Sequence, residues 1–254
     1  MKIALFSDIH ANLPSLQAVL ANIDSLKPDL IYCLGDLVGY APYPNEVINE
    51  IRKRKIPTIA GNYDEGIGLA SDNCGCAYKA EEEKSNGAIS IAYTNQIIKP
   101  EERAFLKNLP RHFAIDFEHN GEKFKLLMVH GSPRKINEYL FEDRDEKSVM
   151  RIMEFGNADI MAFGHTHKPY HRILKNENGT HRHAINIGSV GKPKDGDNRA
   201  CYVILDINPR TSMKDPESIK VEFIRVSYDF ESIAQAIEAS PLPNEYADML
   251  RKAY

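Results

Sequence analysis

Residues 2–36 read KIALFSDIHANLPSLQAVLANIDSLKPDLIYCLGD, and this stretch decides the fold class. Apolar runs at 2–7 and 30–34 have the length of short buried strands, and between them leucine and isoleucine recur at helical spacing. Asn12 is typical of a helix start, and Lys27 followed by Pro28 is typical of a helix stop. A strand, a helix and a strand in this order predict a right-handed crossover between two parallel strands.

The same alternation continues along most of the chain. Pro44 opens a helix that we expect to run to about Arg54, and an apolar run at 56–60 predicts a third strand. Later elements are predicted as a hairpin over 113–129 around Asn120 and Gly121, a helix around Val149, and strands at 160–163, 185–187, 201–207 and 221–226.

Residues 65–108 differ from the rest, because they are strongly charged at 81–84 and have no strand pattern. We predict a single domain spanning 1–254 with a helical cap inserted at about 65–108. Parallel units first and antiparallel strands later predict an α/β sandwich, in which two mixed sheets pack together and helices cover the outer faces. Ligands of such folds gather where the strands end.

The composition is that of an ordinary globular protein. Hydrophobic residues make up 43% of the 254 and charged residues 27%, which excludes a disordered, collagen-like or low-complexity chain. The 32 Lys and Arg stand against 36 Asp and Glu, a net charge of -4. This balance disfavours long nucleic acids and anionic membranes as partners.

The four cysteines predict a reducing, cytoplasmic location. They are too few for a disulfide framework in a chain of this length, and Cys33 and Cys201 lie inside apolar runs. The first residues reach the charged Asp8 too early for a signal peptide, and no stretch approaches the ~18 apolar residues of a membrane-spanning helix. Cys74 and Cys76 are predicted to be loop thiols, the alternative being a redox or soft-metal site.

Seven side chains of metal-ligand type follow the apolar runs: Asp8, His10, Asp36, Asn62, His130, His165 and His167. Side chains two apart on an extended segment point to the same face, so each Asp-x-His or His-x-His pair can converge on one point. Carboxylate, imidazole and amide without thiolate suit Mn, Fe or Zn. Seven ligands are too many for one ion. We therefore predict two divalent ions about 3.5–4 Å apart that share a carboxylate and a water, producing a bridging hydroxide that attacks phosphorus in line.

Each motif also has a simpler interpretation. An isolated Asp-x-His is usually a turn or a helix cap, and Gly-Asp or Gly-Asn after a strand is usually turn chemistry. The run Gly164-His165-Thr166-His167 is a stronger indication of metal binding, because two imidazoles beside a glycine are unusual core residues. Five such motifs in this order, each closing an apolar run, favour the metal site.

The ordered set resembles the calcineurin-like metallophosphoesterase family. The matching motifs are Asp8-Ile9-His10, Gly35-Asp36, Gly61-Asn62, His130-Gly131 and Gly164-His165-Thr166-His167. The resemblance implies a four-layer sandwich and a metal-dependent hydrolase of phosphoric esters or anhydrides. It also implies that Asp8, His10 and His167 hold one ion, that Asn62, His130 and His165 hold the other, and that Asp36 bridges them. Asp36, Asn62 and His130 thereby belong to the catalytic machinery.

The chain departs from the family pattern at two coupled positions. Many relatives have a histidine after Gly-Asn that protonates the leaving group, and the phosphoprotein-phosphatase branch supports it with an aspartate. Here these positions are Tyr63 and Gly39. The chain is therefore more similar to the small prokaryotic branch often described as phosphodiesterases.

The replacement has a chemical consequence. Tyr63, predicted as a catalytic hydrogen-bond donor, is a poor acid at neutral pH, because a tyrosine ordinarily has a pKa of about 10. We therefore expect a preference for good leaving groups, unless His171 substitutes as the acid; the alternative for His171 is a solvated strand residue.

The substrate residues are less specific. Arg134 could hold a substrate phosphate through its guanidinium, or be an ordinary surface arginine. Tyr40, Tyr43 and Tyr139 could stack on a base, or simply pack. The sequence predicts a phosphodiesterase or nucleotide phosphoanhydride hydrolase that acts on a small phosphorylated or nucleotide substrate. The alternatives are a phosphomonoesterase or protein phosphatase, and a non-catalytic binding module on the same fold.

Overall fold

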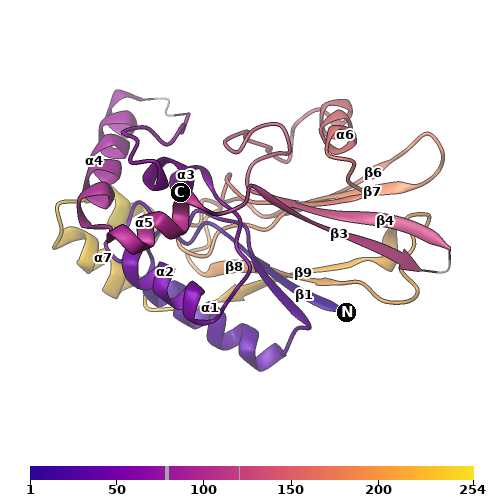
Figure 1. The fold of residues 1–254 in the computed structure, drawn as a ribbon, viewed down its shortest axis with the longest axis horizontal. Helices are drawn as coiled ribbons and strands as arrows, with labels where there is room; N and C mark the ends of the chain where they lie inside the picture. Colours follow the sequence, from indigo (N-terminus) through magenta and orange to yellow (C-terminus); the bar gives the residue numbers. More distant parts are fainter. Residues whose placement is uncertain (78–79, 120) are drawn as a thin grey trace.

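The strands form two mixed sheets that lie one above the other (Figure 1). The computed structural model describes residues 1–77, 80–119 and 121–254. The first sheet has the order β2 (Leu30–Cys33), β1 (Lys2–Phe6), β8 (Ala200–Asp206) and β9 (Lys220–Val226). The second has the order β3 (His112–His119), β4 (Glu122–Val129), β5 (Ile160–Phe163), β7 (His181–Asn186) and β6 (Tyr170–Lys175). Parallel pairing joins β1 with β2 and β5 with both β4 and β7.

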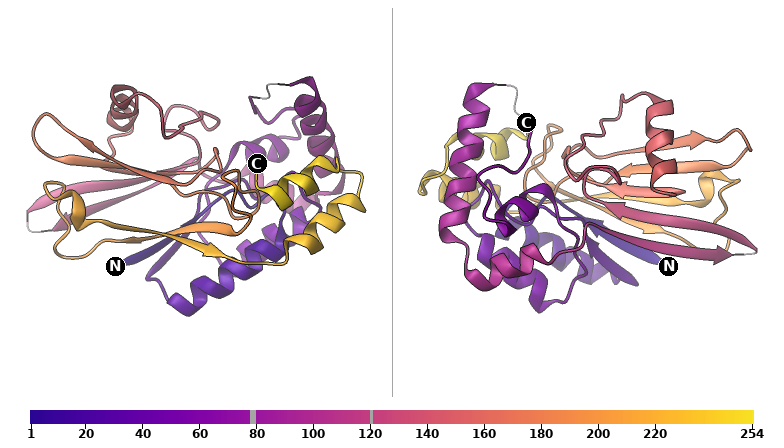
Figure 2. Two further views of the ribbon diagram at one scale, coloured as in Figure 1. Left: turned by 180° about the vertical axis from the view of Figure 1, so that it is seen from behind. Right: turned by 45° about the horizontal axis from the view of Figure 1, so that its top comes forward.

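Helices cover the outer face of each sheet. On the first sheet lie α1 (Leu13–Leu26), α2 (Pro44–Lys53), α7 (Phe230–Glu238) and α8 (Glu245–Lys252). On the second lies α6 (Glu146–Phe155). Figure 2 shows the C-terminal helices, in yellow, beside α1. Between α2 and β3 come α3 (Asn62–Gly68), α4 (Glu81–Ile97) and α5 (Pro100–Lys107), and the short η1 (Pro216–Ser218) precedes β9.

The period-two alternation of the strands produces the layers. In β1, Ile3 and Leu5 face the core between the sheets, whereas Ala4 and Phe6 face the helices. On the second sheet, Phe163 packs against α6. The predicted four-layer arrangement of helices, sheet, sheet and helix is therefore confirmed.

The first crossover forms as its sequence predicts. The Asn12 side chain accepts a hydrogen bond from the Ser15 N–H at 3.2 Å, which caps α1. At the other end Lys27 adopts the left-handed conformation, and its N–H donates to the Ile23 carbonyl. Both helix boundaries are set by local chemistry.

The predicted third strand at 56–60 is wrong. Thr58 makes a single parallel bridge with Cys33, and the Ala60 N–H then donates to the Pro110 carbonyl instead of continuing the ladder. Pro57 has no N–H to add. Conversely, the sequence missed β6, α7 and the full length of β7. The predicted turn residue Asn120 lies outside the described residues.

No helix in the described part of the chain has the length and apolar character needed to cross a membrane. The segment 65–108 contains helices, and its motion as a cap stays a prediction.

Candidate metal centre

The candidate ligands lie on loops that leave the carboxyl ends of the strands. In chain order, Asp8 and His10 follow β1, Asp36 follows β2, Asn62 begins α3, His130 follows β4, and His165 and His167 follow β5. Because parallel strands of both sheets end here, residues more than 150 positions apart meet at one place.

Six of these side chains form two buried triads. One consists of Asp8, His10 and His167, the other of Asp36, His130 and His165, and within each triad the ligand atoms lie within 4.8 Å of one another. Asp36 lies between the triads, because its Oδ2 is 3.6 Å from His10 Nε2 and 3.3 Å from His130 Nε2. None of the six residues is more than 4% exposed.

Asn62 adds an amide oxygen to the second triad. Its Oδ1 lies 3.2 Å from His130 Nε2. Its Nδ2 donates to the Cys74 carbonyl at 2.8 Å, which directs the amide oxygen toward the triad. All seven predicted ligands therefore lie together.

Backbone carbonyls orient three of the imidazoles. The Nδ1 atoms of His10, His130 and His167 lie 3.0, 2.8 and 2.6 Å from the carbonyls of Val38, Leu34 and Lys192. A carbonyl only accepts, so each Nδ1 donates, and a neutral ring then presents the Nε2 lone pair to the centre. Such anchoring is the usual support of a metal-bound histidine.

Five of the seven candidate ligands have left-handed backbone. The φ angles are 56° at Asp8, 49° at His10, 55° at Asp36, 66° at His165 and 60° at His167. The sequence predicted that the side chains of each pair converge because the segment is extended. In the structure they converge because the backbone is left-handed at both residues of the pair. Left-handed backbone at non-glycine residues costs free energy and clusters at functional sites.

A glycine allows the loops after β1 and β5 to touch. A Cβ on Gly164 would lie 2.4 Å from Asp8 Oδ2, which leaves no room for a side chain. The neighbouring His165 N–H donates to the same Oδ2 at 3.1 Å. Asp8 is thereby oriented with its other oxygen toward the first triad.

The protonation states suit cation binding. Burial lowers the pKa of His10 to about 3 and those of His165 and His167 well below the ordinary value, so these rings are neutral at pH 7. Burial also disfavours the charged form of His130, but Asp36 and Asp8 outweigh it and raise its pKa to about 10. A cation beside Asp36 would take the place of that proton.

Two buried ligand atoms are left without a hydrogen bond to any other protein group that the structure describes. Asp8 Oδ1 and His165 Nε2 have no hydrogen-bond partner within the described ranges. Buried polar atoms are normally paired, and these two lie one in each triad. The donor set of carboxylate, imidazole and amide therefore fits two divalent cations.

The sequence missed two residues that hold the ligand loops. Asp64 is fully buried; its Oδ1 accepts the Leu37 N–H at 2.8 Å and its Oδ2 accepts the Gly61 N–H at 2.9 Å, which ties the Gly-Asp loop to the Gly-Asn loop. Burial and the neighbouring Asp36 raise its pKa to about 7, against these two donors. Asn186 donates to the Gly164 carbonyl at 2.9 Å. In the sequence, Asp64 could have been noticed as an acid two residues after Gly-Asn, and Asn186 as an amide within an apolar run.

Tyr63 is buried beside the first triad, and its role as a catalytic hydrogen-bond donor stays a prediction. Its ring is 1% exposed and packs edge-on against His10, with centroids 5.5 Å apart. A Cβ on Gly39 would lie 2.4 Å from the Tyr63 ring, and Gly39 has φ +90°. The ring thus fills the space that a side chain at position 39 would need, which explains physically why the two departures from the family pattern are coupled.

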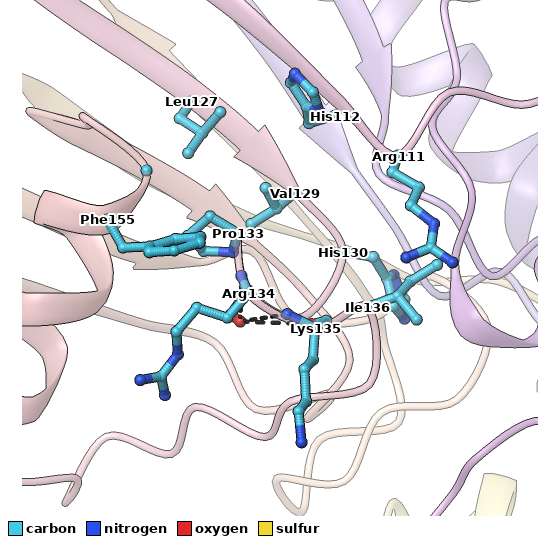
Figure 3. A pocket seen from close by; sticks show the side chains of 12 residues that line it. Arg111, His112, Leu127, Val129, His130, Pro133, Arg134, Lys135, Ile136 and Phe155 are labelled. Atoms are coloured by element: carbon cyan, nitrogen blue, oxygen red, sulfur yellow. Dashed lines mark hydrogen bonds between the residues drawn. The ribbon is translucent and has the colours of Figure 1, made fainter.

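Arg134 and His171 are also directed elsewhere. Arg134 forms a two-pronged ion pair with Glu138. It lines a cavity of about 270 Å³ beside β4, where its guanidinium points away from His130 (Figure 3). The Nε2 of His171 lies 2.9 Å from Nδ1 of His183, and neither triad includes it. That these residues assist the substrate stays a prediction.

A larger cavity of about 750 Å³ lies against the triads. Its lining includes Thr166, between two ligand histidines, and Tyr139, whose ring centroid is 4.1 Å from that of His165. Tyr40 also lines it, whereas Tyr43 packs against the helical core. Cys76 borders the cavity with its Sγ 3.5 Å from Asn62 Nδ2, so it is more than a remote loop thiol.

Comparison with known proteins agrees with this geometry. A family model described as "Calcineurin-like phosphoesterase superfamily domain" matches residues 1–210. An uncharacterised protein of Methanocaldococcus jannaschii is 34% identical, over 98% of this chain and 96% of its own length. A metallophosphoesterase of Sphaerobacter thermophilus has a similar crystal structure, with a TM-score of 0.73, 26% identity, and coverage of 100% of this chain and 99% of its own. A hypothetical protein of Pyrococcus horikoshii shares the fold with a TM-score of 0.78, 24% identity, and coverage of 100% and 98%.

Proposed function

Since the chain belongs to the calcineurin-like phosphoesterase superfamily and is a metal-dependent phosphoesterase, we propose that it hydrolyses phosphodiester or nucleotide phosphoanhydride bonds at the two triads. Asp8, His10 and His167 would hold one divalent ion, and Asn62, His130 and His165 would hold the other, with Asp36 available to both. Such ions, when bound, supply Lewis acidity toward phosphoryl oxygens and activate a water molecule at neutral pH.

One observation carries the proposal. Asp36 Oδ2 lies within 3.6 Å of a histidine from each triad, while each triad also contains a buried, unpartnered ligand atom among the described residues. A two-ion hydrolytic site is expected to have a carboxylate between two groups of ligands. Here each of the two groups contains one ligand atom that has no hydrogen-bond partner among the described residues.

The protein residues orient the ligands and shape the approach of the substrate. The carbonyl-anchored imidazoles keep their rings fixed, so the ligand set needs little rearrangement when ions bind. The ligands are buried, which shields them from bulk water. The substrate phosphate approaches through the cavity that contains Thr166 and Tyr139.

The position of Tyr63 predicts the choice of leaving group. Since Tyr63 is packed under Gly39, and no described residue that lines the cavity is a histidine, the site lacks the histidine that usually protonates a poor leaving group. Anhydrides and aryl esters should therefore react faster than alkyl esters. A series of aryl phosphodiesters should show a steep fall in rate as the pKa of the leaving group rises, and a flat dependence would contradict this.

The test is hydrolysis of bis(p-nitrophenyl) phosphate and p-nitrophenyl phosphate by metal-stripped protein with Mn²⁺ added back. Turnover of the diester should require Mn²⁺ and fall at least 100-fold in Asp36→Asn. Asp143→Asn, the same chemical change at an exposed aspartate, should keep wild-type activity. Equal turnover without metal, or full activity of Asp36→Asn, would refute the proposal. Turnover of the monoester alone would favour a phosphomonoesterase.

A further inference from the structure

Three lysine side chains lie in the wall of the cavity beside the triads. Lys168, Lys192 and Lys194 line it, and Lys192 is only 4% exposed. The Lys192 Nζ lies 3.2 Å from the Met249 thioether and 4.8 Å from the centroid of the Tyr40 ring. In residues 1–77, 80–119 and 121–254, no carboxylate forms a salt bridge with any of the three lysines.

A buried ammonium without a carboxylate is costly. Thioether sulfur is a weak acceptor, and an aromatic face compensates only part of the lost hydration of the charge. The carboxylates that line the same cavity, Glu82, Glu83 and Glu245, are exposed. Among the described residues the lysines in the deep part of the cavity therefore form no ion pair with a carboxylate, although Glu83 and Asp8 are near enough to attract their charge. An anionic group of a ligand would fit this position.

The lysines stand beside the metal centre. The Lys192 carbonyl accepts the Nδ1–H of the ligand His167 at 2.6 Å. The backbone N–H of Lys194 donates to the carbonyl of the same His167 at 3.3 Å. An anion held by the lysines would thus be a neighbour of a phosphoryl group at the triads, within one substrate molecule.

Aromatic rings form another wall of the cavity. Tyr139 and Phe141 stack nearly parallel, with an interplanar angle of 15° and centroids 5.7 Å apart. Phe141 is 44% exposed although it is large and apolar. Exposed rings beside a phosphate site are a platform on which a nucleobase can stack. The volume of about 750 Å³ is in the ordinary range of small-molecule sites.

We propose that Lys192 and Lys194 bind a second phosphate of the substrate, and that the substrate is a nucleotide with an internal phosphoanhydride whose base stacks near Phe141. This inference rests on the proposed function and names its substrate class. In the reaction, water oxygen forms a bond to one phosphorus, and the bond from that phosphorus to the bridging oxygen breaks. The departing phosphate keeps the electron pair, and the released proton goes to solvent.

The test separates binding from catalysis. The methylene-bridged analogue of ADP, which cannot be hydrolysed, is titrated calorimetrically into the Mn²⁺-loaded and the chelator-treated protein. Lys194→Gln and Lys192→Met should each raise its Kd at least 10-fold in the Mn²⁺-loaded protein. Lys175→Gln, the removal of an exposed lysine on β6, should leave the Kd within 2-fold. Phe141→Ala should weaken binding of the nucleotide but not of methylenediphosphonate.

Kinetics supply the second readout. In Lys194→Gln the kcat/KM of ADP hydrolysis should fall at least 10-fold further than that of bis(p-nitrophenyl) phosphate, which has one phosphate. Lys175→Gln should change neither value by more than 2-fold. Unchanged Kd values in both lysine variants would overturn the inference even if the diester is hydrolysed. Lysine-dependent binding of the analogue by a protein that hydrolyses neither substrate would instead refute the proposed function and retain the anion site. If Lys192→Met does not fold, Lys194→Gln alone decides.

Discussion

Asp64 offers a strict test of how the ligand loops are held. Its carboxylate is fully buried, and its two oxygens accept the N–H groups of Leu37 and Gly61, one beside Asp36 and the other beside Asn62. Replacing it by alanine leaves both donors buried and unpaired. Replacing it by asparagine retains one acceptor and turns an amide NH₂ toward the other N–H.

The expected losses follow from counting those donors. An unpaired buried N–H costs about 1–3 kcal/mol, so Asp64→Ala should lower the free energy of unfolding by about 2–6 kcal/mol and Asp64→Asn by about 1–3 kcal/mol. At roughly 2–4 °C per kcal/mol for a chain near this size, the alanine variant should lose about 4–24 °C in Tm. Because the loops that hold Asp36 and Asn62 loosen, affinity for Mn²⁺ should fall roughly 10- to 100-fold.

Thermal unfolding of chelator-treated protein at pH 8 measures the first effect, and calorimetric titration with Mn²⁺ measures the second. Glu65→Gln is the matched control, because Glu65 lies on the same helix but pairs with Arg111 at the surface. It should cost less than about 1 kcal/mol. If Asp64→Ala unfolds with the Tm of Glu65→Gln and binds Mn²⁺ normally, Asp64 does not hold the loops.

Three further outcomes are expected. Gly39→Ala should destabilise the fold by about 2–5 kcal/mol, from left-handed strain and from collision with the Tyr63 ring; in a Tyr63→Leu background the added cost should drop to about 1–2 kcal/mol, and equal costs in a double-mutant cycle would contradict the contact. Burial, together with His171, lowers the pKa of His183 to about 4 in the folded protein, so its contribution to stability is complete above the unfolded pKa of about 6.5 and is lost as pH falls toward 4. His183→Leu should therefore lose up to about 3 kcal/mol less than wild type between pH 7 and pH 4 in denaturant titrations, and parallel curves would be evidence against the shift. Mn²⁺ at 100 times its Kd should stabilise chelator-treated protein by about 2.7 kcal/mol for each ion bound, and Asp36→Asn should need more Mn²⁺ for the same gain in Tm; an identical gain at every concentration would exclude Asp36 as a ligand.

Local patterns were sufficient for much of the fold. The strand, helix and strand of residues 2–33 could be predicted because β1 is a continuous apolar run that is buried on both faces, and because Asn12 and Lys27 cap α1 with their own atoms. The candidate metal ligands could likewise be recognised in the sequence, since a polar motif that follows an apolar run lies at a strand end. The strand predicted at 56–60 is wrong because Pro57 interrupts the ladder of hydrogen bonds. The apolar character of these residues alone does not reveal this.

By itself the sequence determined which residues could bind metal and at which end of the sheets they would lie. Only the tertiary structure decided how they converge, through left-handed loops and through Asp64 and Asn186. It alone also placed Tyr63 under Gly39 and gathered the lysines with rings from distant parts of the chain. The physical reason is that periodicity and capping record interactions over a few residues. Steric exclusion, unpaired buried charge and shared hydrogen bonds instead depend on which distant segments meet.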